Sequence, residues 1–413
     1  MNNSISFNPS IKTGVGQISD LSKWENAKQL FDKGKFLESF YETLNYLDEN
    51  LIKNYGNKEK TEFNFPQGSA VVIVKLIDNK VEITAPFVKI PEKKFLPIFR
   101  KCTELNFKVM TLPQIIIKDD YLVFQYSMPI ETCEPYKLYD VLRDIAQNAD
   151  KYDDEFVDKF GAERIMEPMV THYDDNKLQE ILETFQAIAK ETLEHINYFE
   201  GKRRMGNACD ALYVGLKRLD YYSEPSGMLY KKIDDALVIM FDRNNDLVAK
   251  LKAGKQFLSD VQKLNTTNFK ESVFMSYSLI PLKRNASRNY LEGWIESYLE
   301  HTQELYNNED YISSTYHALY TLYTMLANFK LEANSLKAVE YSLEKAANQE
   351  WMEAADTLIE VMDFFYQNQE EELEMEETVT TEQAFDMNAY MAQMGNVMQN
   401  YQSMIGNLMK SFK

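Results

Sequence analysis

The sequence predicts an α+β N-terminal domain, built from helices and antiparallel strands, followed by a mostly helical array of hairpins, so the chain is mainly α overall. Three observations predict this fold class. Strand-like and helical patterns alternate up to about residues 124–138, after which helical spacing dominates. Glycine (14) and proline (11) are scarce among 413 residues, which favours long helices over many tight turns. Hydrophobic residues make up 45%, enough for sizeable cores in two or three domains.

The chain begins with a polar segment, and we expect residues 1–20 to be a flexible lead. Helical spacing follows at once. An apolar face from Trp24 to Phe31 predicts a first helix, and a turn at Lys33-Gly34 starts a second one.

Two pairs of strands are predicted next, each closed by a tight turn. β-branched residues flank Asp78-Asn79, and a second strand pair surrounds Asp119-Asp120. Between the pairs, "PEKKFLPIFRKCTEL" has helical spacing, with Pro91 placed for a first turn. A long helix follows over "YKLYDVLRDIAQNADKYDDEFVDKF". The order is therefore α, two strands, α, two strands, α, which is a segregated α+β arrangement.

This order resembles the type III secretion chaperone-like (Tir chaperone-like) fold. The resemblance also rests on "YLVFQYSMPI", a last strand that runs through Pro129 into a helix rich in acids and tyrosine. It covers residues 21–165, about a third of the chain. It implies a domain that binds other proteins, often as a dimer, and that has no catalytic motif. The N-terminal hairpin and the long C-terminal extension depart from the family.

Residues 166–368 are predicted to form helical hairpins. Three joints share a pattern, "LFDKGKFLES", "LYNNEDYISS" and "AANQEWMEAA", in which a polar turn of four residues precedes an aromatic residue. A small residue follows three positions later, where it lets the partner helix approach. The aromatic and small residues are Phe36, Tyr311, Trp351, Ser39, Ser314 and Ala354. The joints resemble those of tetratricopeptide repeats, with generic αα-hairpins as the alternative, and either would offer extended surfaces for proteins.

Two stretches of the helical region are harder to assign. The apolar spacing of residues 228–252 predicts one continuous helix. "ESVFMSYSLIPLKR" fits a strand as well as a helix, and "YSLIP" echoes "YSMPI". A second, degenerate chaperone-like unit within residues 233–285 is therefore left open.

The C-terminal part combines an acidic linker with a methionine-rich helix. Six glutamates fall between residues 370 and 377, so residues 369–383 are predicted to be an extended linker. In the tail, residues 384–413, apolar side chains alternate spacings of four and three, which is a heptad seam. We predict that this seam binds a partner; its residues are Met387, Met391, Met394, Met398, Tyr401, Ile405, Leu408 and Phe412.

Three surfaces compete for this seam: the protein's own array, another protein or second copy, and a membrane. Methionine is flexible and polarizable, which suits adaptable protein contacts. A membrane surface is disfavoured, because the polar face has few Lys or Arg and the neighbouring glutamates would repel anionic lipid.

Charge and composition restrict the partners. The formal net charge is −19, and such an acidic surface repels phosphate backbones, so nucleic acid is not expected as a partner. The N-terminus lacks the features of a secretory signal, and no stretch has 18 apolar residues without charges. Cys102, Cys133 and Cys209 are far apart and are expected to be reduced, buried thiols. These features predict a cytoplasmic protein.

The residues that usually carry chemistry form no catalytic or metal-binding motif. None of the four histidines, His172, His195, His301 and His317, sits in a metal motif, and surface or helix-cap positions are expected for them. Asp150, Asp153, Asp154 and Asp158 are expected to form a solvated helix face. The basic "GKRRM" could dock a carboxylate-rich partner or the protein's own acidic segment. We therefore expect no catalytic residues, no metal and no cofactor.

These observations favour a non-catalytic protein-binding scaffold or chaperone-like adaptor. Its partners would be other proteins, and homo-oligomers through the chaperone-like domain or the tail remain open. The alternatives are a membrane-peripheral assembly factor that uses the tail helix, and an enzyme without a recognisable motif.

The tail should bind a partner conditionally and should not be essential to the fold of the array. Gly395 and Gly406 keep the isolated helix marginal, so its order must come from contact. Each buried Met contributes roughly 1.5–3 kcal/mol, so loss of the seam should weaken partner capture or self-association. The test variant replaces four residues together by Ser: Met391, Met394, Met398 and Tyr401. Its melting temperature should stay nearly unchanged. A drop of many degrees on deleting residues 384–413 would instead place the seam in the protein's own core.

Overall fold

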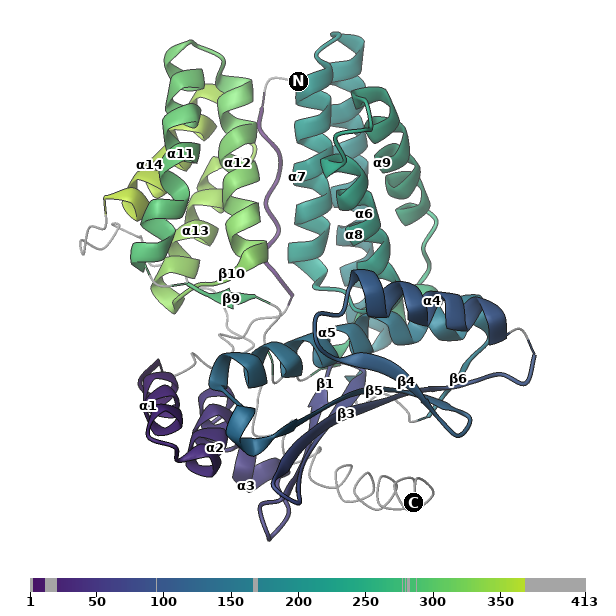
Figure 1. Cartoon of the computed structure of the whole chain (residues 1–413). Helices are drawn as coiled ribbons and strands as arrows, with labels where there is room; N and C mark the ends of the chain where they lie inside the picture. The colour runs from purple at the N-terminus through teal and green to yellow at the C-terminus, as the bar shows by residue number, and fades with distance from the viewer. Residues whose placement is uncertain are drawn as a thin grey trace.

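The chain folds into an α+β half and a helical half (Figure 1). The computed structural model describes residues 3–11, 21–93, 95–165, 170–276, 278, 280, 283–286 and 288–367. The predicted fold class is confirmed, because an antiparallel sheet occupies the N-terminal half and helices make up most of the remainder. Each half has its own hydrophobic core, and of the described residues beyond α5 and β6, Ile280 alone enters the core of the α+β half.

The α+β half is a twisted antiparallel sheet with helices α4 and α5 against one face (Figure 1). The strand order is β1-β2-β3-β5-β4, and β6 pairs with the end of β3. The helices are α1 (Leu21–Asp32), α2 (Phe36–Leu47), α3 (Leu51–Tyr55), α4 (Phe95–Lys108) and α5 (Pro135–Phe160), with a 3-10 turn η1 (Ile130–Thr132). The strands are β1 (Glu62–Gln67), β2 (Ala70–Ile77), β3 (Lys80–Lys89), β4 (Gln114–Lys118), β5 (Tyr121–Pro129) and β6 (Glu163–Arg164).

The two predicted hairpin turns are confirmed. Asp78 and Asn79 both have positive φ, 47° and 64°, which is the backbone of the two-residue turn that matches strand twist. Asp119 has a φ of 53° between β4 and β5. Asp and Asn tolerate this left-handed conformation better than most residues.

The predicted strand count within residues 21–165 was too low by two, because β1 and the two-residue β6 were missed. Phe63 and Phe65 on β1 are fully buried, and the strand pairs along its length with β2. Its sequence, "EFNFPQ", shows only a brief alternation and contains Pro66, which argues against a central strand. At the sheet edge, however, a proline removes no ladder hydrogen bond, so the strand is tolerated there.

The helical half consists of two groups of helices joined where α7 packs against α12 (Figure 1). The first group contains α6 (Asp175–Gly201), α7 (Met205–Ser223), α8 (Gly227–Phe241), α9 (Leu247–Val261) and α10 (Thr266–Lys270). The second contains α11 (Arg288–Asn307), α12 (Tyr311–Asn328), α13 (Ala333–Ala346) and α14 (Trp351–Tyr366). Short strands pair in two places: β7 (Val170–Thr171) with β8 (Met275–Ser276), and β9 (Arg284–Asn285) with β10 (Phe329–Lys330).

The single helix predicted over residues 228–252 is two helices. The chain turns after α8, where the Asp242 carboxylate accepts from the N–H of Asn244, and Asp246 caps α9 by accepting from the N–H of Ala249. Short polar side chains thus satisfy the backbone in a turn and end the apolar periodicity. In the described part of residues 233–285 the strands are only two residues long, so these residues form no second chaperone-like sheet.

The three predicted helix–turn–helix joints are present. The Phe31 and Phe36 rings lie 5.2 Å apart at the α1–α2 joint, and those of Tyr306 and Tyr311 lie 5.1 Å apart at the α11–α12 joint. At the third joint, Trp351 is buried as the first residue of α14. The aromatic side chains therefore fill the turns as the pattern predicts.

The predicted small residues lie against the preceding helix. The Ser39 hydroxyl donates to the carbonyl of Ala27 at 2.8 Å, and the Ser314 hydroxyl donates to that of Thr302 at 3.0 Å. Ala354 is fully buried at the third joint. A larger side chain at these positions would separate the paired helices.

The turns reverse through left-handed residues. Gly34 and Glu309 have positive φ, and the amide that follows each bonds to the carbonyl five positions before it. Arg203 repeats this geometry between α6 and α7, at a joint that the sequence patterns did not single out. There Met205 stands where the other joints have an aromatic residue, so the pattern missed it.

The flexible lead predicted at residues 1–20 is wrong for residues 3–11. They run in an extended conformation between α7 and α12 (Figure 1), and Ile5 is only 5% exposed. Ser4 donates its N–H to the carbonyl of Gln349, and Ile11 donates to that of Tyr222. A short polar sequence carries no sign of such a groove, which is formed by residues from 185 to 345 positions away. Residues 1, 2 and 12–20 lie outside the described residues.

Alanine substitutions at two glycines with positive φ distinguish the cost of backbone strain from the cost of steric crowding. At Gly68 (φ 57°) an added Cβ would lie 2.1 Å from Oδ1 of Asp150, whereas at Gly34 (φ 72°) it would meet open space. Gly34→Ala should lower the free energy of unfolding by about 1 kcal/mol through strain alone. Gly68→Ala should cost a further 1–3 kcal/mol, roughly, because it displaces a carboxylate that Ser69 bonds. Urea unfolding of both variants measures this; equal losses would contradict the described turn.

Candidate functional site

The sheet has an open edge at β4. Strands β5 and β4 end the sheet on this side, and the Asn106 side chain of α4 bonds both the N–H and the carbonyl of Ile115, at 2.7 and 3.0 Å. The peptide groups of Ile115 therefore point away from β5. Since alternate residues of an antiparallel strand share this direction, the N–H and carbonyl of Ile117 also face the open side.

Asn106 acts as a partial cap on this edge. Its amide imitates one residue of a neighbouring strand and satisfies Ile115, while no described residue does the same for Ile117. An edge of this kind can accept another extended chain, because main-chain hydrogen bonds supply part of the affinity.

Exposed apolar side chains surround the same edge. Ile117 is 53% exposed, although it shares a sheet face with the buried Ile115, because helical cover ends before it. Phe107, near the end of α4, is 85% exposed. The other exposed apolar side chains on α4 and on the loop after it are those of Phe95, Leu96, Val109 and Leu112. Several exposed apolar side chains gathered near one sheet edge are typical of an interaction site.

These features define an edge surface, consisting of β4, the outer face of α4 and the loop between them. It offers hydrogen-bonding groups for an extended backbone and apolar side chains for alternate residues of that chain. This combination suits the binding of an extended polypeptide.

The acidic cluster of α5 is a joint between the two halves, which corrects the expectation of a solvated face. Asp150 accepts hydrogen bonds from the N–H and hydroxyl of Ser69, at 2.5 and 2.8 Å. Asp153 accepts from Ser69 at 2.8 Å and from Arg164 at 2.6 Å, and Arg164 also pairs with Asp154. The α5 carboxylates thus fix the β1–β2 turn and the residues after α5.

The same helix face holds the helical half. The Asp154 carboxylate accepts from the N–H of Met228 at 3.3 Å, where α8 begins, and Gly227 leaves no room for a Cβ beside it. Lys151 pairs with Asp234 on α8 at 2.7 Å. Of the predicted cluster, only Asp158 is exposed. Tertiary contacts, which helical spacing cannot reveal, bury Asp153 and partly bury Asp150 and Asp154.

His195 is buried and His317 is half-buried, although surface or cap positions were expected for all four histidines. Nδ1 of His195 lies 2.7 Å from the Tyr316 hydroxyl, and Nδ1 of His317 lies 2.8 Å from that of Thr302. Burial lowers the pKa of each to about 4, so both are neutral at physiological pH. His172 and His301 are exposed, as expected.

The three cysteines are free and buried, as predicted. Burial raises the pKa of Cys102 and Cys133 to about 12 and that of Cys209 to about 11. Such thiols are protonated at neutral pH and are poor nucleophiles.

The predicted basic spot partly pairs within the chain. Arg204 lies 3.0 Å from the Asp310 carboxylate, which caps α12, and Lys202 lies over the Tyr198 ring. The predicted partner-binding residues of the tail lie outside the described residues, from Met387 to Phe412. The described ranges contain no helix long and apolar enough to span a membrane and no group of three or more metal-ligating side chains.

A family comparison agrees with the α+β half. Residues 43–168 match the family described as "T3SS (YopN, CesT) and YbjN peptide-binding chaperone 1". The matched stretch begins in α2 and extends past β6, so it includes the whole sheet and the edge surface. It supports the resemblance drawn from the element order, and it supports a peptide- or protein-binding role and a non-catalytic class at family level. No curated protein matches the chain.

Asp153 should make the joint sensitive to pH. Burial and the neighbouring Asp154 raise its pKa to about 7, and Arg164 opposes them. Because a free aspartate has a pKa of about 3.9, the protonated carboxyl contributes stability that is complete below pH 4 and is lost as pH rises through 7. The free energy of unfolding of Asp153→Asn should therefore rise by about 2 kcal/mol relative to that of the natural chain as the pH increases from 5 to 8. Urea unfolding at both pH values measures this difference.

Asp158→Asn is the matched control, since this carboxylate is exposed on the same helix. The difference in free energy of unfolding between this variant and the natural chain should stay constant from pH 5 to pH 8. A constant difference for Asp153→Asn as well would contradict the raised pKa.

Proposed function

We propose that this protein is a non-catalytic, chaperone-like protein-binding scaffold that holds an extended segment of a client protein along the edge surface. The observation that carries the proposal is the open β4 edge, with the peptide groups of Ile117 beside exposed apolar side chains. The family match supports it, because it covers this domain and describes peptide-binding chaperones. The client adds a strand to β4, and its alternate side chains contact Ile117 and the outer face of α4.

The helical half extends the scaffold. Its paired helices, with aromatic and small residues at the joints, support an assignment to tetratricopeptide-like hairpins, which present extended surfaces to proteins. We also propose that the tail seam from Met387 to Phe412 contributes a further client contact, on the evidence of its heptad spacing.

An exposed isoleucine on another strand provides a matched test. Ile117→Lys should weaken the binding of extended apolar peptides at least 10-fold, because a charge replaces apolar surface at the edge. Ile77→Lys, at a position 44% exposed on β2 against 53% for Ile117, should bind as the natural chain does. Fluorescence anisotropy with ten-residue peptides chosen from a peptide array measures both.

A variant that should increase the affinity for peptides distinguishes strand addition from general hydrophobic contact. Asn106→Ala frees the N–H and carbonyl of Ile115 and should strengthen peptide binding. Equal effects of the two lysine variants, or weaker binding by a folded Asn106→Ala chain, would contradict binding by strand addition at β4.

A further inference from the structure

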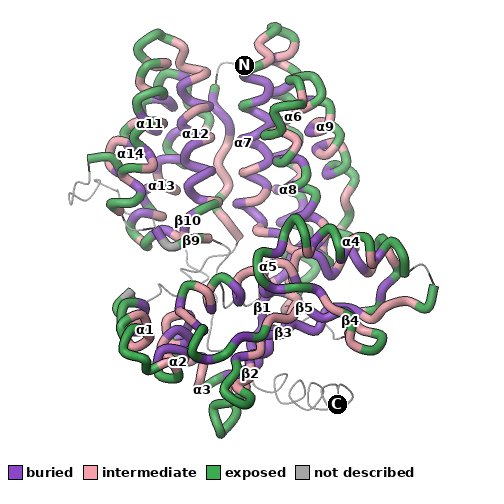
Figure 2. Tube along the Cα trace, in the orientation of Figure 1, coloured by how far each residue is buried: buried purple, intermediate pink, exposed green. Residues whose placement is uncertain are grey.

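The helical half holds residues 3–11 as a protein holds a bound peptide. The segment, here called the resident segment, lies along the seam between α7 and α12 (Figure 2). Ser4 and Ile5 are buried, Asn3 and Pro9 are exposed, and its other residues are half-buried. Ile5 is inserted in the core of the helical half, and Phe7 stacks on Tyr221 at 6.3 Å. Residues Phe7 and Ile11 are only partly buried, so the segment lies in the surface of the seam and is not threaded through it.

A buried ion pair binds the backbone of Ser6. Arg218 is 2% exposed and pairs with Glu191 at 2.7 Å. Glu191 accepts from the Ser6 N–H at 2.9 Å and from its hydroxyl at 3.0 Å, while Arg218 donates to the Ser6 carbonyl at 2.6 Å. The pair therefore contacts the N–H, the carbonyl and the side chain of one residue, as a neighbouring strand would.

The charge state of Glu191 suits this role. Burial raises the pKa of this carboxyl, but the Arg218 guanidinium and the Ser6 donors outweigh burial and hold the pKa below its ordinary value. Glu191 is therefore an ionised acceptor at neutral pH. A basic residue in place of Ser6 would meet Arg218, and an acidic one would meet Glu191, so the site selects a small uncharged residue.

The α13–α14 turn supplies a second set of contacts. Its left-handed residue is Asn348, one position earlier in the turn than Glu309 at the α11–α12 joint. Ser4 donates its N–H to the carbonyl of Gln349 and its hydroxyl to the carbonyl of Ala346. The N–H of Asn348 donates to the carbonyl of Ile5. This joint therefore directs its peptide groups toward an extended chain.

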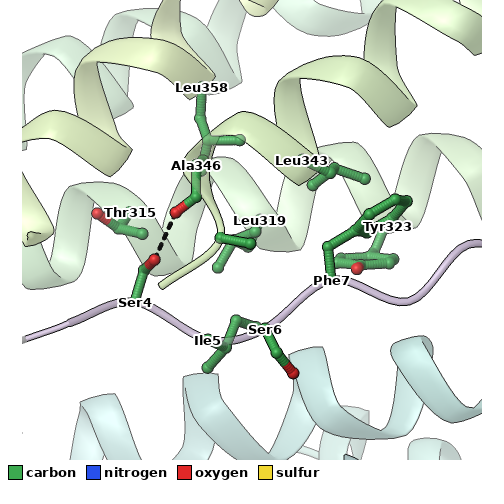
Figure 3. A pocket seen from close by; sticks show the side chains of 11 residues that line it. Ser4, Ile5, Ser6, Phe7, Thr315, Leu319, Tyr323, Leu343, Ala346 and Leu358 are labelled. Atoms are coloured by element: carbon green, nitrogen blue, oxygen red, sulfur yellow. Dashed lines mark hydrogen bonds between the residues drawn. The ribbon is translucent and has the colours of Figure 1, made fainter. Parts of the chain in front are cut away.

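The resident segment does not fill its groove. A small cavity remains beside Ser4 and Phe7 (Figure 3), and it is lined by apolar and aromatic side chains that include Leu319, Tyr323 and Leu343. Nε of the buried Arg218 has no acceptor among the described residues. The cavity has room for about one water molecule, so the resident segment leaves a small gap in the seam.

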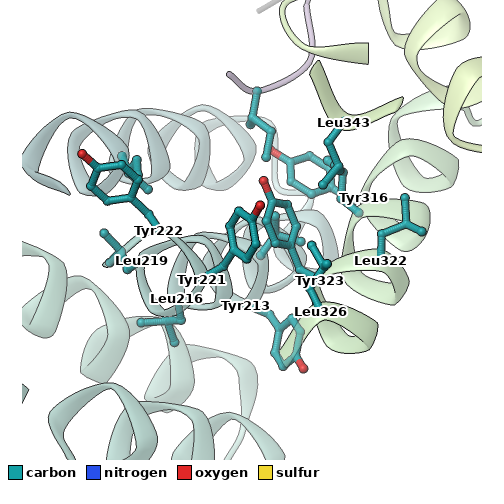
Figure 4. Packing of buried hydrophobic residues seen from close by; sticks show 14 of the residues in the cluster. Tyr213, Leu216, Leu219, Tyr221, Tyr222, Tyr316, Leu322, Tyr323, Leu326 and Leu343 are labelled. Atoms are coloured by element: carbon teal, nitrogen blue, oxygen red, sulfur yellow. The ribbon is translucent and has the colours of Figure 1, made fainter. Parts of the chain in front are cut away.

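The two helix groups contact each other without the resident segment. Tyr213 bonds Thr324 at 3.1 Å and stacks near Tyr320 at 4.5 Å, and Tyr221 lies 5.8 Å from Tyr323. Figure 4 shows Tyr221 of α7 beside Tyr323 of α12 in the seam. Departure of the segment would leave these contacts in place and would expose the Arg218–Glu191 pair, which retains its own ion pair.

We propose that the groove between α7 and α12 is a second polypeptide-binding site, that residues 3–11 are its resident intramolecular ligand, and that an extended, uncharged segment of a partner protein displaces them. The partner segment has a small hydroxyl residue between two apolar residues, as in Ile5-Ser6-Phe7. The resident segment thus lowers the affinity of the groove for partners by competition. This site is separate from the edge surface, so Ile117→Lys should not affect it.

The test uses the full chain with a site for a specific protease introduced between Ile11 and Leu21. Cutting there leaves every contact of the resident segment intact and makes it a non-covalent ligand. A labelled peptide of residues 1–12 should then exchange into the cut chain, and binding to the uncut chain should be at least 10-fold weaker, because the tethered segment competes. The matched control peptide carries Ser6→Lys and should bind the cut chain at least 10-fold more weakly.

Competition then tests the partner chemistry. Unlabelled peptides that keep Ile5-Ser6-Phe7 but replace the flanking residues by alanine should compete, and a peptide with Ser6→Asp should not. The proposal is overturned if the cut chain takes up no label over a day, since the segment is then part of the fixed core. It is equally overturned if the Ser6→Lys peptide binds as well as the natural one.

Discussion

The carboxylates on one face of α5 bond both halves of the molecule, and the positions of both proposed binding surfaces depend on them. Asp150 and Asp153 bond the β1–β2 turn through Ser69, while Asp154 bonds the start of α8 at Met228. Arg164 lies between Asp153 and Asp154 and offsets part of their mutual repulsion. A polar joint of this kind is directional, because each oxygen requires a donor at a set position. It therefore orients the sheet relative to the helices more strictly than apolar contact would.

The two surfaces that we propose bind polypeptides are of different kinds. At the edge surface, the backbone of β4 provides the hydrogen-bonding groups, and Asn106 imitates a missing strand. In the seam, helices have no free strand edge, so the Arg218–Glu191 pair and the α13–α14 turn provide those groups. Both solutions satisfy the same requirement, since an extended chain that leaves water must find partners for its N–H and carbonyl groups.

The helix joints show how one local geometry serves two purposes. At the α1–α2 and α11–α12 joints, a left-handed residue lets the turn satisfy its own peptide groups. At the α13–α14 joint the left-handed residue is Asn348, and the peptide groups of Ala346, Asn348 and Gln349 bond Ser4 and Ile5. When the left-handed residue lies one position earlier in the turn, peptide groups of the turn thus bond a neighbouring extended chain.

The sequence by itself determined the fold class, the two hairpin turns, the helix joints and the buried cysteines, because these depend on neighbours within a few positions. Asp78-Asn79 favours a tight turn wherever it stands, and Phe31 meets Phe36 across four residues. Only the tertiary structure decided the fate of Asp153, His195 and residues 3–11. Their partners, Arg164, Tyr316 and the α7–α12 seam, lie from 11 to more than 300 positions away in the chain. Burial and pairing at such separations arise when distant elements pack, and no local periodicity records them.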